Sequence, residues 1–159
     1  LVYDVDEKLW HEWSTNTTGN HGVFTYDFMC DPGLGYALVL HSSNGTLYKV
    51  DVNAYVDNET TILCDIITNK YDMDSYHRKF MSSLKLVGDS YSPNNIVSFY
   101  WTDDDYQSWS NEKQINMNDD YPAFQRLGSF RRRAFRFFHN SNAPLRLESV
   151  EVEYQEGAT

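Results

Sequence analysis

The feature that most constrains this chain is a segment near its end, residues 126–138, in which arginines and aromatic residues follow a glycine turn. Gly128 permits a turn or bulge without a Cβ penalty. We expect a β-strand to follow, and in a strand successive side chains point to opposite faces. One face then carries Arg131, Arg133, Phe135 and Phe137, and the other carries Arg132, Ala134, Arg136 and Phe138.

The arginines of this segment stand out because the rest of the chain is acidic. Residues 1–123 contain 7 basic and 19 acidic residues, whereas residues 124–159 contain 6 basic and 4 acidic residues. Guanidinium groups pair bidentately with carboxylates, either within a domain or across a subunit boundary. Both roles remain open from the sequence. The candidate interface residues are Arg126, Arg131, Arg133 and Arg136.

Composition favours an all-β protein. Aromatic residues make up 16% of the 159 residues, and Asn, Asp, Ser and Thr are frequent between the apolar stretches. Aromatic residues are enriched in strands, and the small polar residues are typical of turns. No segment shows a convincing helical period. The net charge of −10 argues against non-specific binding of DNA or of an anionic membrane.

The strand pattern divides the chain at about residue 56. Residues 1–5 and 47–51 are similar to one another, and an Asn44-Gly45 turn joins two apolar stretches, as in the strand meander of a β-propeller. We therefore interpret residues 1–56 as terminal propeller-blade strands and residues 57–159 as an antiparallel β-sandwich. Alternation in residues 144–154 changes register near Ser149, which predicts a bulge. Because residue 1 begins within an apparent strand, we expect the chain to be a fragment of a longer protein.

An Asp-rich hairpin precedes the arginine segment. Residues 101–109, Trp-Thr-Asp-Asp-Asp-Tyr-Gln-Ser-Trp, approximate the Asp-box pattern Ser/Thr-x-Asp-x-Gly-x-Thr-Trp. In that pattern the Asp side chain caps backbone amides of the turn, and the Trp folds over it. We expect Trp101, Asp104 and Trp109 to hold the hairpin. The alternative is a calcium site built from Asp103, Asp104 and Asp105, although a full ligand set is not visible.

The sequence contains none of the catalytic motifs for which we searched. It has no Gly-x-Ser-x-Gly motif, phosphate loop or dinucleotide fingerprint, so we predict no enzymatic activity, cofactor or metal. Cys30 and Cys64 lack metal-ligand spacing, and free thiols are favoured over a disulfide. None of the five histidines has a recognised metal spacing: His11, His21, His41, His77 and His139.

Three features follow one another in a fixed order. They are the hairpin ending in Ser108-Trp109, the stretch Arg126-Leu127-Gly128-Ser129-Phe130-Arg131-x-Arg133-x-Phe135, and the closing Pro-x-Arg-x-Glu strand. Their order resembles the C-terminal part of propeller-bearing tail proteins of short-tailed bacteriophages. These include packaged-DNA stabilisation, or head-closure, proteins and tail nozzle proteins. The sharp part of the resemblance covers residues 96–138, and Tyr106 departs from it by standing where the hairpin pattern has glycine.

The resemblance implies a non-enzymatic virion structural protein, made in the host cytoplasm. It implies a ring of copies, commonly sixfold, which extends the DNA channel below the portal. Portal or adaptor proteins and distal tail proteins would be its partners, with no membrane. DNA would pass without specific binding, and a negatively charged channel suits that passage.

Two other classes stay open. A carbohydrate-binding β-sandwich, such as a receptor-binding module, would use the abundant exposed aromatic residues. An Asp-box hydrolase of the sialidase kind is disfavoured, because there is one degenerate Asp-box and no assignable arginine triad or acid and nucleophile pair.

Overall fold

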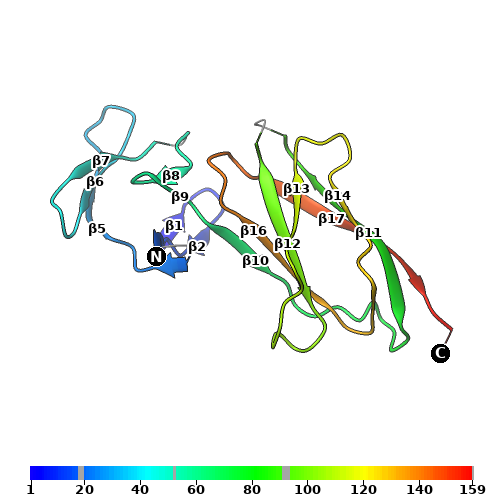
Figure 1. The fold of residues 1–159 in the computed structure, drawn as a ribbon. Coiled ribbons are helices and arrows are strands. Elements are labelled where there is room, and N and C mark those ends of the chain that lie inside the picture. Colours follow the sequence, from blue (N-terminus) through cyan, green and yellow to red (C-terminus); the bar gives the residue numbers. More distant parts are fainter. Residues whose placement is uncertain (18–19, 52, 91–93, 159) are drawn as a thin grey trace. The chain divides into compact units, whose positions relative to one another are not determined.

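The computed structural model describes residues 1–17, 20–51, 53–90 and 94–158, and within them every regular element is a β-strand (Figure 1). The predicted all-β class is confirmed. The chain forms two compact units, Leu1–Leu63 and Cys64–Thr159, which we call unit 1 and unit 2. The sequence placed the boundary at residues 56 and 57, whereas the compact units divide between Leu63 and Cys64.

In the described part of unit 1, short antiparallel strands form four small sheets: β1 with β2, β3 with β4, β5–β6–β7, and β8 with β9. Their bounds are β1 Val2–Asp4, β2 Leu9–His11, β3 Thr15–Thr17, β4 Asn20–Gly22, β5 Tyr26–Cys30, β6 Leu38–His41, β7 Leu47–Lys49, β8 Val56–Asp57 and β9 Thr60–Thr61. The Asn44-Gly45 turn joins β6 and β7, with Gly45 at φ 66°. None of these sheets has the four strands of a propeller blade, so the propeller stays a prediction.

Unit 2 contains two antiparallel sheets. One has the order β10–β16–β12–β13, and in the other β14 and β15 pair with one edge of β11 while β17 pairs with the opposite edge. The bounds are β10 Cys64–Ile67, β11 Lys79–Gly88, β12 Ile96–Thr102, β13 Lys113–Asn116, β14 Ala123–Gln125, β15 Ser129–Phe130, β16 Ala134–His139 and β17 Leu147–Glu156. The predicted bulge is present, because the register shifts where Val87 pairs with Ser149 and Gly88 with Leu147.

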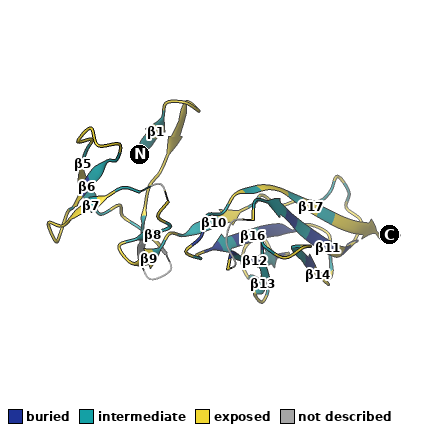
Figure 2. Cartoon of the chain, turned by 90° about the horizontal axis from the view of Figure 1, so that it is seen from above, coloured by how far each residue is buried: buried dark blue, intermediate teal, exposed yellow. Residues whose placement is uncertain are grey.

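Both sheets of unit 2 contribute to one hydrophobic core, and the buried residues of the chain concentrate there (Figure 2). Phe99 on β12 lies at its centre, with its ring centroid 4.6 Å from Phe124 and 5.3 Å from Phe137. Burying one such side chain contributes about 1.5–3 kcal/mol. The core residues are Met81, Leu84, Leu86, Val97, Phe99, Met117, Phe124, Leu127, Phe130, Phe135 and Phe137.

The sequence predicted one continuous strand after Gly128, and this prediction is wrong. Strand β15 ends at Phe130 in one sheet, and β16 begins at Ala134 in the other. Residues 131–133 cross between the sheets, and Arg133 makes an isolated bridge with Tyr71. The predicted division of faces holds within β16, where Phe135 and Phe137 are buried in the core and Arg136 and Phe138 are half-buried.

Candidate functional site

The turn that precedes the arginines uses left-handed backbone at two positions. Arg126 has φ 59° and Gly128 has φ 71°, and Leu127 between them is buried in the core. A Cβ added at Gly128 would meet no atom within 4 Å, so glycine is favoured there by its backbone conformation and not by space. The Met81 amide donates to the Gly128 carbonyl at 2.9 Å, which aligns the turn with β11.

Arg133 lies inside unit 2. Its side chain is 2% exposed, and Nε and one terminal nitrogen donate to the Asp103 carboxylate at 2.7 and 2.8 Å. The other terminal nitrogen donates to the Leu127 carbonyl at 2.6 Å. The guanidinium carbon lies 4.4 Å from the Phe130 ring centroid and 5.2 Å from that of Trp101. This one side chain therefore joins the Asp hairpin to the Gly128 turn, and it is not available to a partner subunit.

Arg136 lies on the outer face of the β10–β16–β12–β13 sheet. It donates to both oxygens of Asp65, at 2.8 and 2.7 Å, and this pairing raises the pKa of the Arg136 guanidinium. Three aromatic rings surround it, with centroids 5.7–6.0 Å from the guanidinium carbon: Tyr100, Trp109 and Phe138. Two of the four predicted interface arginines, Arg133 and Arg136, are thus paired with carboxylates of unit 2 itself.

The other two candidates, Arg126 and Arg131, are exposed. Among the described residues, neither forms an ion pair with a carboxylate. Arg132 is also exposed, but it pairs with Asp105 at 2.7 Å. The structure therefore separates the segment into internal and outward-facing arginines, and the interface hypothesis now concerns Arg126 and Arg131.

Asp104 caps the hairpin between β12 and β13. One of its oxygens accepts the backbone amides of Gln107 and Ser108, at 3.1 and 3.0 Å, and the Thr102 hydroxyl at 2.7 Å. The Ser108 hydroxyl donates to the other oxygen. Hydrogen bonds from Ser108 and Thr102 are the main reasons why the pKa of Asp104 falls to about 2. Tyr106 has φ 68°, so it adopts the conformation for which the pattern uses glycine.

The two tryptophans of the hairpin have different surroundings. Trp101 packs against the core and lies beside Arg133, whereas Trp109 lies 6.1 Å from the Tyr106 ring and 6.0 Å from the Arg136 guanidinium. The Tyr106 hydroxyl donates to the Thr68 carbonyl at 3.0 Å. These contacts connect the hairpin with the segment that follows β10.

The three consecutive aspartates serve separate protein partners. Asp103 pairs with Arg133 and Asp104 caps the turn, while Asp105 accepts from both Lys70 and Arg132 at 2.7 Å. Their oxygens therefore do not form a common ligand set of the kind that the calcium alternative requires.

In unit 1, Asp4, Glu7 and His11 bring their potential ligand atoms within 4.8 Å of one another. There the Asp4 carboxylate accepts the amides of Asp6 and Glu7 and so acts as a turn cap.

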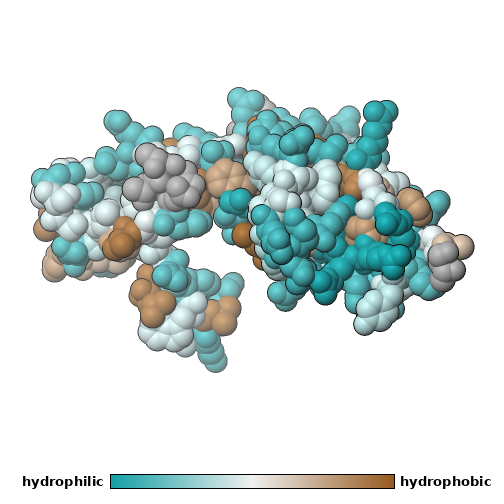
Figure 3. Space-filling view, turned by 60° about the horizontal axis from the view of Figure 1, so that its bottom comes forward, coloured by the Kyte–Doolittle hydropathy of each residue, from teal (hydrophilic) through white to brown (hydrophobic). Residues whose placement is uncertain are grey.

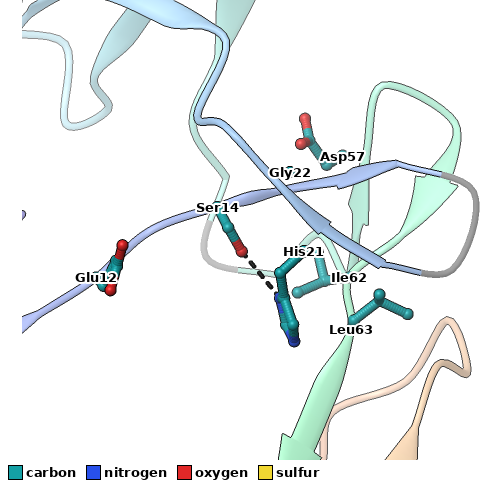
Figure 4. Close-up of a pocket in the computed structure, with 7 residues that line it drawn as sticks. All are labelled: Glu12, Ser14, His21, Gly22, Asp57, Ile62 and Leu63. Atoms are coloured by element: carbon teal, nitrogen blue, oxygen red, sulfur yellow. Dashed lines mark hydrogen bonds between the residues drawn. The ribbon is translucent and has the colours of Figure 1, made fainter.

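Unit 1 also contains a hollow of about 540 Å³, in which Ser14 and His21 meet (Figure 4). The Ser14 hydroxyl lies 3.0 Å from His21 Nδ1. A catalytic triad needs a third group that orients the imidazole. Glu12 and Asp57 lie apart from the ring in Figure 4, and the Asp57 carboxylate already accepts the Tyr26 hydroxyl. The pair therefore does not extend to a triad within the described residues.

Sequence reasoning missed a second basic group that contacts the arginine segment. Lys79 is fully buried at the start of β11, and its ammonium donates to the carbonyls of Ser75 and Arg131, the latter at 3.0 Å. Its neighbour Arg78 donates to the Ser129 hydroxyl at 3.0 Å. Both lie about fifty residues before the segment, and no spacing in the sequence links them to it.

No protein-family model matches this sequence, and no curated protein is similar to it at a significant level. Cys30 and Cys64 are half-buried thiols, and burial raises the pKa of Cys64. The described residues include no helix long and apolar enough to cross a membrane.

Proposed function

We propose that this chain is part of a non-enzymatic structural protein of a short-tailed bacteriophage virion. It forms a ring in the tail that continues or closes the DNA channel below the portal. The observation that carries the proposal is the coupling of the Asp hairpin to the arginine segment through the Arg133 and Asp103 pair. These two motifs form the sharp part of the resemblance to tail proteins, which covers residues 96–138.

The distribution of charge supports the same proposal. Arg126 and Arg131 are exposed without a carboxylate partner among the described residues, in a chain of net charge −10. An acidic surface disfavours tight binding of DNA phosphates, and exposed guanidinium groups favour contact with carboxylates of another subunit. Ring copies, portal or adaptor proteins and distal tail proteins are the partners proposed.

The test is the mass of the parent protein, alone and with purified portal complex, by light scattering or native mass spectrometry. We expect a discrete ring, or one that forms only on the portal. Replacing Arg126 and Arg131 together with alanine should weaken that ring. Arg146→Ala is the matched control, because Arg146 is exposed but already lies near Asp89 and Glu148. A persistent monomer that ignores the portal contradicts the proposal.

The second candidate is a carbohydrate-binding β-sandwich. One observation favours it: the outer face around Arg136 combines the rings of Tyr100, Trp109 and Phe138 with planar polar groups. Gln114 on β13 donates to the carboxylate of Glu112 at 3.1 Å beside these rings. Glycan-array binding that disappears in Trp109→Ala and persists in Trp10→Ala, an exposed tryptophan of unit 1, would favour this function over the tail ring.

A further inference from the structure

A hollow of about 290 Å³ opens at the start of β11 in unit 2, and Arg78, Phe80 and Arg131 are among the residues that line it. A second hollow, of about 360 Å³, shares Tyr76 and Arg131 with it. Arg131 thus faces both, and we call the pair the basic hollow. Each is near the lower limit of size for a binding site.

Two cations of the basic hollow, Arg78 and Arg131, have no ion-pair partner among the described residues. Asp72 and Asp103 also line the second hollow, where Asp72 accepts the Asp74 amide and Asp103 pairs with Arg133. The chain has 23 acidic and 13 basic residues, so a carboxylate partner is easy to find. Three exposed cations of unit 2 have one: Lys70 and Arg132 pair with Asp105, and Arg146 pairs with Asp89. Among the described residues, Arg78 and Arg131 form no ion pair, and the Arg78 guanidinium donates to the Ser129 hydroxyl. Two unpaired guanidinium groups at one hollow favour an anionic occupant.

Exposed aromatic rings lie beside these cations. Tyr76 is 87% exposed and Phe80 is 51% exposed. The backbone at Gly157 lies close to one edge of the Phe80 ring, since a Cβ at that position would lie 2.9 Å from it. The occupant should therefore carry both negative charge and a flat apolar group, as a short acidic peptide with an aromatic side chain does.

Unit 2 itself presents such a peptide. In the turn between β13 and β14, Asp119 and Asp120 are exposed and form no ion pair among the described residues, and the Tyr121 side chain is 58% exposed. Backbone hydrogen bonds hold this turn in place, from the Asp119 amide to the Asn116 carbonyl and from the Ala123 amide to the Tyr121 carbonyl. We call residues 119–121 the acidic turn.

The acidic turn and the basic hollow lie toward opposite ends of the same strand. The Leu86 amide bonds to the Pro122 carbonyl beside the turn, whereas Phe80 lines the hollow. Six residues along a strand span about 20 Å. One copy cannot place its own turn in its own hollow, but a second copy can supply the turn.

We propose that the acidic turn of one copy docks into the basic hollow of the next, with Asp119 and Asp120 facing Arg131 and Arg78. Tyr121 lies against the exposed rings of the neighbour. A contact between two different surfaces of identical chains is head-to-tail, and it closes into a ring when the rotation permits. This inference rests on the proposed ring and names the surfaces that build it.

Charge reversal tests this contact in the full parent protein, assembled with purified portal complex and followed by sedimentation velocity. Arg131→Glu and Asp120→Arg each place like charges at the contact, and each alone should weaken assembly by about 10-fold or more. An equimolar mixture of the two variants should recover it, because the reversed turn of one variant fits the reversed hollow of the other. Raising the salt concentration should weaken wild-type assembly.

Thermal unfolding of each variant controls for the fold, and both side chains are exposed, so little change is expected. If the wild type forms a ring that neither reversal affects, the contact is wrong and the tail-ring function survives. If both variants fail while remaining folded, and mixing does not restore assembly, the pairing is also wrong. If the wild type forms no ring under any condition, the proposed function fails.

Discussion

Units 1 and 2 share the same aromatic-rich composition, but they bury their apolar side chains to very different extents. Unit 2 encloses eleven buried apolar residues in one core. In the described part of unit 1, a single apolar residue, Val39, is buried. Large apolar side chains of unit 1 remain in contact with solvent, such as Trp10 at 68% and Val23 at 86% exposure. Apolar residues are visible on the surface of unit 1 in Figure 3.

The difference shows that strand-forming composition does not by itself supply a core. Each small sheet in the described part of unit 1 has two or three strands, and sheets of this size are marginally stable in water. In unit 2, two sheets of the same kind of strand cover each other, so alternate residues of β11, β12 and β16 become buried. The two units therefore differ in apolar burial because two sheets pack face to face in unit 2, and not because their aromatic contents differ.

The largest expected effect comes from separating the units. Residues 64–159 expressed alone should unfold cooperatively in urea, because their core is internal to the segment. Residues 1–63 expressed alone should show no cooperative transition, because burial of one apolar side chain cannot offset the entropy of ordering the chain. Near-ultraviolet circular dichroism and amide dispersion in NMR measure both. A dispersed spectrum for residues 1–63 would contradict the comparison.

A matched pair of phenylalanines sharpens the comparison at single positions. Phe99→Ala in unit 2 removes a fully buried ring and should lower the free energy of unfolding by about 3–5 kcal/mol. Phe28→Ala in unit 1 removes a ring that is 57% exposed and should change it by about 0.5 kcal/mol or less. Urea titration of the full chain, followed through the transition of unit 2, distinguishes the two. Equal effects would mean that Phe28 is buried in structure that unfolds together with unit 2.

Neighbouring arginines allow the same comparison within unit 2. Arg133→Ala removes a buried guanidinium together with its bonds to Asp103 and Leu127, and should cost about 3 kcal/mol of unfolding free energy. This is the lower end for a buried pair, because the Asp103 side chain is 40% exposed and regains water. Arg132→Ala should cost about 1 kcal/mol or less, since both partners are half-exposed.

A double variant then separates stability from assembly at the same segment. Arg126→Ala combined with Arg131→Ala should leave the unfolding free energy within about 0.5 kcal/mol of wild type. If the double variant destabilised unit 2 as much as Arg133→Ala, the division between internal and outward arginines would be wrong.

Much of this arrangement could be predicted from local sequence signals. The Asn44-Gly45 turn and the register change near Ser149 are local features, as is the alternation within β16, and all three appear where the sequence places them. The Asp104 cap is local as well, because its partners lie within four residues.

Long-range pairing could not be predicted. A period-two pattern continues through residues 129–138, yet the chain changes sheets between Phe130 and Ala134 because Arg133 turns inward to meet Asp103. The sequence could not choose which arginines pair locally, since Asp65 and Asp103 are 71 and 30 residues away from their partners. The buried position of Lys79 was missed for the same reason.

The smallest expected effect is a pH dependence confined to unit 2. His139 is buried on β16, and its Nε2 lies 2.7 Å from Asn95 Oδ1. The Asn95 amide nitrogen donates to the Pro144 carbonyl at 3.0 Å, so the amide oxygen faces the ring and Nε2 carries the proton. Burial lowers the pKa of His139 from its usual 6.5, because the charged form is poorly solvated there.

The sign of the effect follows from proton uptake. The unfolded chain binds more protons at this position than the folded one, so stability is full above pH 6.5 and falls as the pH drops below that value. His139→Gln keeps a donor toward Asn95 and cannot take up a proton, so its stability should change less over the same range. Urea unfolding of residues 64–159 between about pH 7.5 and 5.5 measures both. Identical pH profiles for the variant and the wild type would show that His139 is hydrated in the folded state.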